Sequence, residues 1–261
     1  MSSSESLGHN SIVDQGDRNE NVNARSLRWL HSAIALVFLS ATLIGFMPFF
    51  TKGEGMGGRQ IPPDFFALVL AHGMLLTTWI MLFFSQAVLI SSRNHRLHMK
   101  FGWSSIAFAL AIVITGFMVT IRSVGPVPNA PFRGMAYHQF MLLMFVELIA
   151  FAVFVALGVA LRKQAAAHKA MMILAVLSVL PASTIRLPFL IPIFGDAGWS
   201  GFYGAVFALG AIILIARSII AGSFDRWFAA GYAAMVVVFV AATKIAVTDF
   251  WSHTAMAILS K

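Results

Sequence analysis

The chain has 261 residues, of which 59% are hydrophobic and only 11% are charged. An ordinary soluble domain is about a quarter charged, so this composition excludes a soluble globule and indicates that the lipid bilayer is the solvent. The formal net charge is +8, but the Lys and Arg residues lie in short segments between apolar runs. That distribution is typical of membrane topology signals and does not favour a nucleic-acid partner. Because there is no Cys, disulfides, thiolate metal sites and a cysteine nucleophile are also excluded.

The apolar residues form seven long segments behind a polar N-terminal stretch. Residues 1–28 are rich in Ser, Asn, Asp and Glu, which predicts a disordered cytoplasmic tail rather than a signal peptide. Residues 29–261 are then a seven-span membrane domain, because each segment is near the roughly 20 residues that a spanning helix needs. Continuous apolar runs favour helices over barrel strands, so the sequence predicts an all-α, polytopic seven-helix bundle. The predicted spans are 29–50, 64–90, 97–121, 132–161, 167–187, 199–220 and 227–251.

The positive charges predict how the chain is oriented. Eleven Lys and Arg residues fall on the side of the N terminus and seven on the opposite side. Because positive loops favour the cytoplasm, we expect the N terminus inside and the C terminus outside, as in a bacterial inner (cytoplasmic) membrane protein. The outer segments 51–63 and 122–134 are rich in Gly and Pro, so we expect them to form an ordered cap or a substrate mouth without regular structure.

Four histidines lie within or at the start of predicted spans, where an ionisable side chain is costly and is a functional-site hypothesis by default. His72 and His138 lie in the outer parts of the second and fourth spans. His98 and His168 lie at the inner starts of the third and fifth spans. Helix rise places these two levels about 20 Å apart. The sequence therefore predicts two histidine pairs at two depths.

Paired imidazoles indicate metal ligation. Neutral imidazole is the commonest protein ligand of transition metals, and a haem iron held by His on both faces carries electrons without an open coordination position. We therefore expect the outer pair and the inner pair each to hold one haem b. Haem propionates need cations, and those at the matching levels are Arg122, Arg133 and Arg186 outside and Arg96, Lys100 and Lys169 inside.

Helical spacing adds two expectations. Arg186 follows His168 by 18 residues, about five turns, so it lies on the same face at the outer level and can serve an outer haem. Gly102 and Gly116 fall on the face of His98, which would leave room there for a flat ring.

This arrangement resembles the transmembrane dihaem cytochrome b561 family over residues 64–187. In that family a four-helix core carries one His per helix, and the first and third ligate one haem while the second and fourth ligate the other. The resemblance implies that His72 and His138 ligate the outer haem and that His98 and His168 ligate the inner one. Residues 72–79 (HGMLLTTW), 96–102 (RLHMKFG) and 168–171 (HKAM) also look like uncharacterised bacterial membrane proteins of this plan.

Two departures from the family matter for function. The chain has seven predicted spans against six in the animal and plant members. It also lacks their Ser-Leu-His-Ser-Trp type segment and their basic ascorbate-binding motif. The resemblance therefore does not extend to ascorbate as the electron donor.

The sequence predicts a b-type dihaem cytochrome that moves electrons across the bilayer and exchanges them with quinone or a small electron carrier. Two alternatives remain, a non-catalytic membrane subunit of a larger energy-transducing complex and a proton or solute transporter. Glu147 lies out of phase with His138, so it either accepts protons for a quinone or pairs with a polar neighbour. Gln86 shares the face of His72 and either donates to the inner haem or packs between helices. His31, at the start of the first span, has no evident partner.

Overall fold

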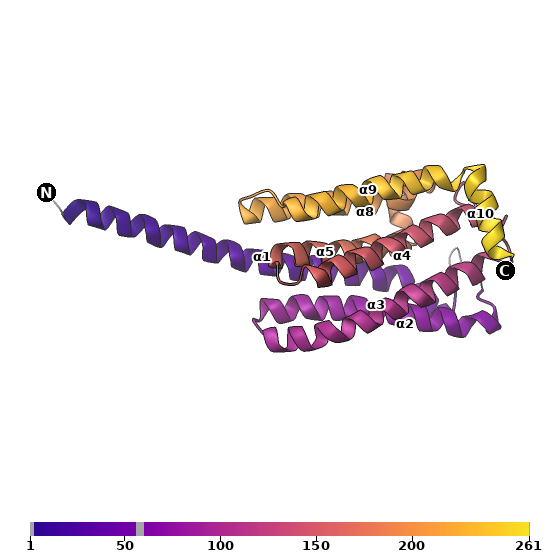
Figure 1. Ribbon diagram of the computed structural model, residues 1–261, viewed down its shortest axis with the longest axis horizontal. Helices are drawn as coiled ribbons and strands as arrows, with labels where there is room; N and C mark the ends of the chain where they lie inside the picture. The colour runs from indigo at the N-terminus through magenta and orange to yellow at the C-terminus, as the bar shows by residue number, and fades with distance from the viewer. Residues whose placement is uncertain (1–2, 56–59, 261) are drawn as a thin grey trace.

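The chain folds into a bundle of long helices, as the composition predicts. The computed structural model describes residues 3–55 and 60–260, with side chains described from Arg25 onward. Within these residues, seven helices are long and apolar enough to cross a membrane, which confirms the all-α polytopic fold (Figure 1). They are α1 (Ser3–Lys52), α2 (Pro63–Ser91), α3 (His95–Val124), α4 (Tyr137–Ala160), α5 (Ala165–Val179) continued by α6 (Pro181–Thr184), α8 (Gly198–Ala221) and α9 (Arg226–Ala246).

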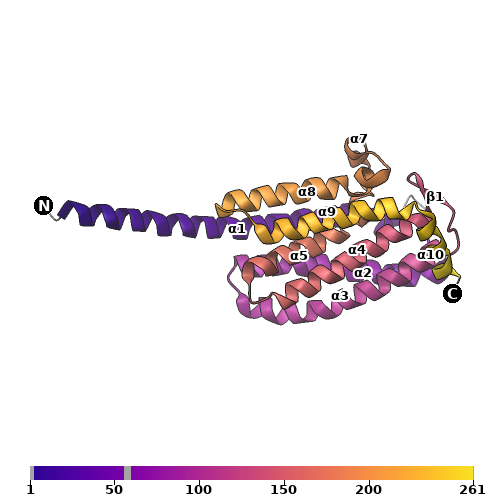
Figure 2. The same ribbon diagram turned by 45° about the horizontal axis from the view of Figure 1, so that its top comes forward.

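Shorter elements connect the helices at one end of the bundle. The segments are the strands β1 (Pro131–Phe132) and β2 (Met135–Ala136), the 3-10 turn η2 (Pro188–Leu190), α7 (Ile191–Phe194) and α10 (Asp249–Leu259). We call this the predicted outer end, and α10 lies across it (Figures 1 and 2). The opposite, predicted inner end carries the tight connections at residues 92–94, 161–164 and 222–225.

Helix α1 extends beyond the bundle at the predicted inner end (Figure 1). It begins at Ser3; the prediction of a disordered tail covers residues 1–28, of which 1 and 2 lie outside the described residues. Residues 3–28 contain no Pro that would interrupt a helix, so the polar stretch continues the helix of the span. The segment that is apolar enough to cross the membrane begins only at Arg25.

Two predicted span boundaries are wrong, and local backbone chemistry explains both. The fourth helix begins at Tyr137 rather than near residue 132, because Arg133 and Gly134 have φ of 46° and 79° and form the turn of the β1–β2 hairpin. The last span ends at Ala246 rather than near residue 251. There Thr248 accepts a hydrogen bond from the backbone N–H of Trp251 and starts the separate helix α10.

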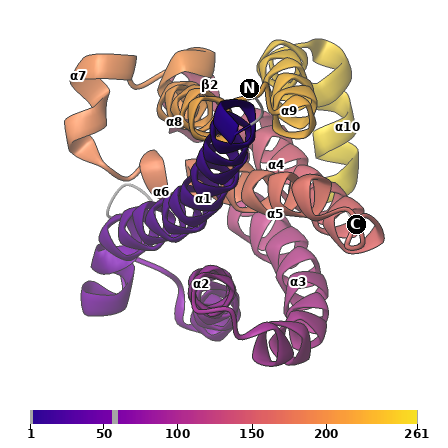
Figure 3. The same ribbon diagram turned by 90° about the vertical axis from the view of Figure 1, so that its left-hand side faces the viewer.

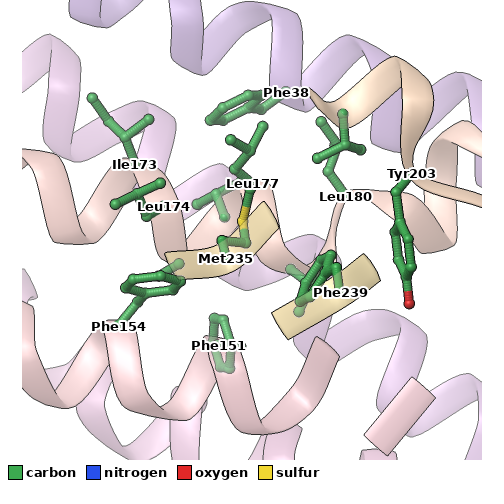
Figure 4. Packing of buried hydrophobic residues seen from close by; sticks show 14 of the residues in the cluster. Phe38, Phe151, Phe154, Ile173, Leu174, Leu177, Leu180, Tyr203, Met235 and Phe239 are labelled. Carbon is green, nitrogen blue, oxygen red and sulfur yellow. The ribbon is translucent and has the colours of Figure 1, made fainter. Parts of the chain in front are cut away.

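Helix α5 is the most enclosed of the spans, with two thirds of its apolar window buried. It lies at the centre of the bundle when this is viewed along the helices (Figure 3). Leu174 and Leu177 of α5 are fully buried, and they lie among Phe151 of α4 and Met235 and Phe239 of α9 (Figure 4). This packing fixes the position of α5, and therefore of the residues at its start.

A buried ion pair ties three helices together at the predicted inner end. Arg217 of α8 is 5% exposed and bonds the Asp225 carboxylate, with Nη2 at 2.5 Å and Nε at 2.8 Å from Oδ2. Arg217 Nη1 also donates to His31 Nε2 of α1. Asp225 Oδ1 accepts the backbone N–H of Phe228 and so caps α9. His31 therefore has a partner, which the sequence did not reveal.

We expect Asp225→Asn to lower the free energy of unfolding by about 3–5 kcal/mol, because it keeps a capping side chain but leaves the buried Arg217 without its counter-charge. Thermal unfolding of the purified protein in detergent measures the change. Asp249→Asn is the matched control, since Asp249 is exposed on α10 and should shift stability by no more than about 0.5 kcal/mol. Equal changes in the free energy of unfolding for the two variants would contradict the assignment of Arg217 and Asp225 as a stabilising buried ion pair.

Candidate functional site

The structure brings the predicted inner pair of histidines together. The ring centroids of His98 on α3 and His168 on α5 lie 6.4 Å apart, and the rings are nearly perpendicular, at 85°. His168 Nδ1 lies 2.8 Å from the Gly158 carbonyl. A carbonyl only accepts, so Nδ1 carries a proton, and in the neutral imidazole Nε2 is then the nitrogen that can accept a hydrogen bond or bind a metal.

Buried polar atoms without partners gather beside this pair. His98 Nδ1 is buried and has no hydrogen-bond partner among the described residues, and the same holds for both side-chain amide atoms of Gln86 on α2. The Gln86 backbone lies next to the His98 ring. Such atoms are rare in proteins, and a bound group is one of the standard explanations. The inner pair with Gln86 is therefore a candidate ligand site.

The predicted outer pair is not brought together in this way. His138, at the first turn of α4, donates from Nδ1 to the Pro128 carbonyl at 2.9 Å, and its Nε2 lies 3.3 Å from Ser252 Oγ of α10. Its own backbone carbonyl accepts the indole N–H of Trp251. In this structure both ring nitrogens of His138 have protein partners, and the residue attaches α10 to the bundle.

His72 faces a different neighbour. Its Nδ1 lies 2.9 Å from Thr115 Oγ1 on α3, and the Thr115 hydroxyl donates its proton to the Ala111 carbonyl at 2.7 Å. The hydroxyl has a single proton, so it must accept from His72 Nδ1. His72 Nε2 is then an unprotonated acceptor.

His72 lines a cavity of about 160 Å³ between the helices toward the predicted outer end. Most of the wall is apolar and includes four aromatic rings, those of Phe46, Phe49, Phe140 and Phe202. The polar groups at the wall come from different segments: His72 from α2, Thr120 from α3, Glu147 from α4 and Arg186 from the segment after α6. The residues Glu54, Gly55 and Ile61, from the predicted substrate mouth, also line it.

Glu147 and Arg186 form an electrostatic pair at this cavity. Glu147 is 8% exposed, and Arg186 acts on its carboxyl electrostatically. Arg186 donates to the Ala182 carbonyl, and its guanidinium carbon lies 4.3 Å from the Phe46 ring centroid. Burial lowers the pKa of Arg186 to about 10, while Tyr137 and Glu147 oppose the shift. The guanidinium therefore stays protonated at neutral pH.

The other predicted cations have varied surroundings. Arg133 donates to the Ile185 and Asp196 carbonyls, and burial lowers its pKa while Asp196 opposes the shift. Lys169 is half-buried next to His168 and interacts electrostatically with Arg217. The remaining three, Arg96, Lys100 and Arg122, are exposed.

Sequence reasoning missed that His72 and Glu147 share one cavity. Glu147 was judged only against His138 on its own helix, where the two are out of phase. The facing of residues on different helices depends on how each helix is rotated, and a single helix's periodicity does not contain that information. The available signal was that Arg186 and Glu147 are both ionisable groups in an otherwise apolar setting.

Two further observations bear on what the site can hold. Among the described residues, there is no group of three or more His, Cys, Asp or Glu side chains that could hold a metal ion. The inner pair therefore offers two imidazoles as its donor set. Comparisons with protein-family models, with curated proteins and with solved structures found no match.

The glycines on α3 give a test of the cavity wall. A Cβ at Gly116 would lie 2.7 Å from a Leu148 methyl carbon and 3.1 Å from His72 Cε1, whereas one at Gly102 would meet nothing within 4 Å. We expect Gly116→Ala to destabilise the protein by about 1–3 kcal/mol through overpacking. Gly102→Ala, the matched control, should be neutral or stabilising by up to about 1 kcal/mol, because Ala favours helix.

Thermal unfolding of the two variants in detergent provides the measurement. Equal stability of the two variants would show that Leu148 and His72 do not press against α3 at Gly116.

Proposed function

We propose that the chain is a b-type membrane cytochrome in which His98 and His168 would hold a haem b. The ring geometry of this pair carries the proposal. Two imidazoles that held the same metal ion through one nitrogen each, at about 2.0–2.1 Å, would have ring centroids no more than roughly 6.3 Å apart. The measured separation is 6.4 Å. Two imidazoles also match what haem requires, since the macrocycle supplies the other four nitrogens.

The surroundings of the inner pair support the same proposal. His168 is oriented by the Gly158 carbonyl, as metal-bound histidines are oriented by a second hydrogen bond. Gln86 provides buried amide atoms that lack partners among the described residues, and Lys169 provides a half-buried cation for a propionate. When bound, haem would supply one-electron redox chemistry, while the protein supplies ligation, orientation and electrostatics.

A second haem between His72 and His138 has less support. A second haem on His72 and His138 would require both rings to leave their present partners, Thr115 for His72 and Pro128 with Ser252 for His138. We therefore propose one haem at the predicted inner end, and quinone or a small carrier as the electron partner elsewhere. The proposed location is the bacterial inner membrane with the N terminus inside. We also propose that the chain is related to the cytochrome b561 family.

The alternatives of a non-catalytic subunit and of a transporter have no comparable observation. A subunit that serves only for packing needs no pair of facing imidazoles with unsatisfied polar atoms beside them. A transporter would need a polar route across the bundle, but the cavity at His72 is walled mainly by apolar side chains.

The test is haem content. We expect the purified protein to show Soret and alpha bands after dithionite reduction and to contain one haem per chain by the pyridine haemochrome assay. His98→Ala and His168→Ala should each abolish the bands, because one imidazole does not hold the haem on both faces.

His138→Ala is the control variant and should keep the full signal. If it instead loses about half, with His98→Ala losing the other half, two haems are present. A colourless wild-type protein would remove the proposal altogether.

A further inference from the structure

The cavity lined by His72, Glu147 and Arg186 has features that the inner haem site does not explain. It lies toward the predicted outer end, whereas His98 and His168 lie at the starts of their helices near the predicted inner end. Glu147 is more than nine-tenths buried and lines the cavity, where Arg186 is the charged group that acts on it electrostatically. A buried carboxyl is costly unless it is hydrogen-bonded, so a ligand in the cavity with a hydroxyl donor would stabilise Glu147.

The size and walls of the cavity select a small ring. Its volume of about 160 Å³ is close to that of engineered apolar cavities of about 150 Å³ that bind benzene. Aromatic side chains from three helices, such as Phe49, Phe140 and Phe202, form much of the wall. A single six-membered ring fits this space, and a larger polar molecule such as a sugar does not match an apolar wall.

The polar groups select the substituents of that ring. His72 Nε2 is an acceptor, because Nδ1 donates to Thr115, and the Glu147 carboxyl is a second group that can accept. A ligand that satisfies both needs hydroxyl donors. The Arg186 guanidinium already has Glu147 as an electrostatic partner, so the site does not call for an anion.

We propose that this cavity binds the ring of a lipid-soluble benzoquinol, with His72 Nε2 and the Glu147 carboxyl as hydrogen-bond partners of its hydroxyl groups. The choice of a redox-active ring over another phenol rests on the proposed electron-carrier function. The cavity lies among membrane-spanning helices, which suits a ligand that arrives from the bilayer. His72 and Glu147 are then binding residues for the electron partner, and His72 is not a haem ligand.

The test is calorimetric titration of the dithionite-reduced full chain in nanodiscs with a short-tailed ubiquinol analogue. Its dimethyl ether, which has the same ring and tail but no O–H donors, is the matched ligand. Neither compound transfers electrons to the reduced protein. We expect the quinol to bind once per chain, and the ether to bind about tenfold or more weakly, because each lost hydrogen bond costs roughly three- to tenfold in affinity.

Two variants locate the binding. His72→Phe keeps a ring of similar size and should weaken quinol binding about three- to tenfold, and Glu147→Leu should act in the same direction. His138→Phe removes another histidine near the predicted outer end, one that does not line the cavity, and should leave quinol affinity unchanged. Equal binding of quinol and ether by the wild type, or equal losses in the two histidine variants, would overturn the proposal.

Absorption spectra of the same samples separate this proposal from the haem proposal. If His72→Phe weakens quinol binding while the haem bands persist, both proposals stand. If the bands are absent but quinol still binds through His72, only the haem proposal fails. If His72→Phe removes haem together with quinol affinity, His72 is a haem ligand and the quinol assignment is overturned.

Discussion

A polar side chain inside this bundle has no bulk water to bond, so it must find a partner in the chain or in a bound ligand. The interior polar groups divide accordingly. Arg217 with Asp225, and His138 with Ser252, have partners on other helices and hold elements in place. In the part of the chain that the structure describes, His98 Nδ1 has no such partner. The groups of the first kind explain the fold, and those of the second kind point to function.

The spans were predictable because length and hydropathy alone decide whether a helix can cross the bilayer. The ends of the spans were harder to predict, because they depend on single residues. The Arg133–Gly134 turn starts the hairpin before α4, and Thr248 caps α10, yet all of these lie within or next to apolar sequence. The link between His31 and Arg217 was not predictable, since 186 residues separate the two and they lie on different helices.

The sequence predicted the depth of each histidine in the bundle, but not which neighbouring helix its side chain faces. Counting residues from the helix ends gives the level of each histidine, and this was sufficient to pair His98 with His168. The same count placed His72 and His138 at one level, but in the structure His138 points toward α10 and His72 toward α3. Depth is a property of one helix, whereas facing is a property of two helices packed together. Glu147 belongs to the site for the same reason, because the polar groups that share the cavity with it lie on other segments of the chain.

The two candidate sites are connected by one face of α2. His72, Trp79 and Gln86 follow each other at intervals of seven residues, which places them on one side of the helix over about 21 Å. His72 lines the cavity, and Gln86 lies beside the inner pair. Between them the indole N–H of Trp79 is fully buried and, like the Gln86 amide, has no partner among the described residues. A helix that served only for packing would gain stability from apolar residues at these positions. The polar groups of α2 therefore follow the line that joins a ring-sized cavity to a facing pair of imidazoles.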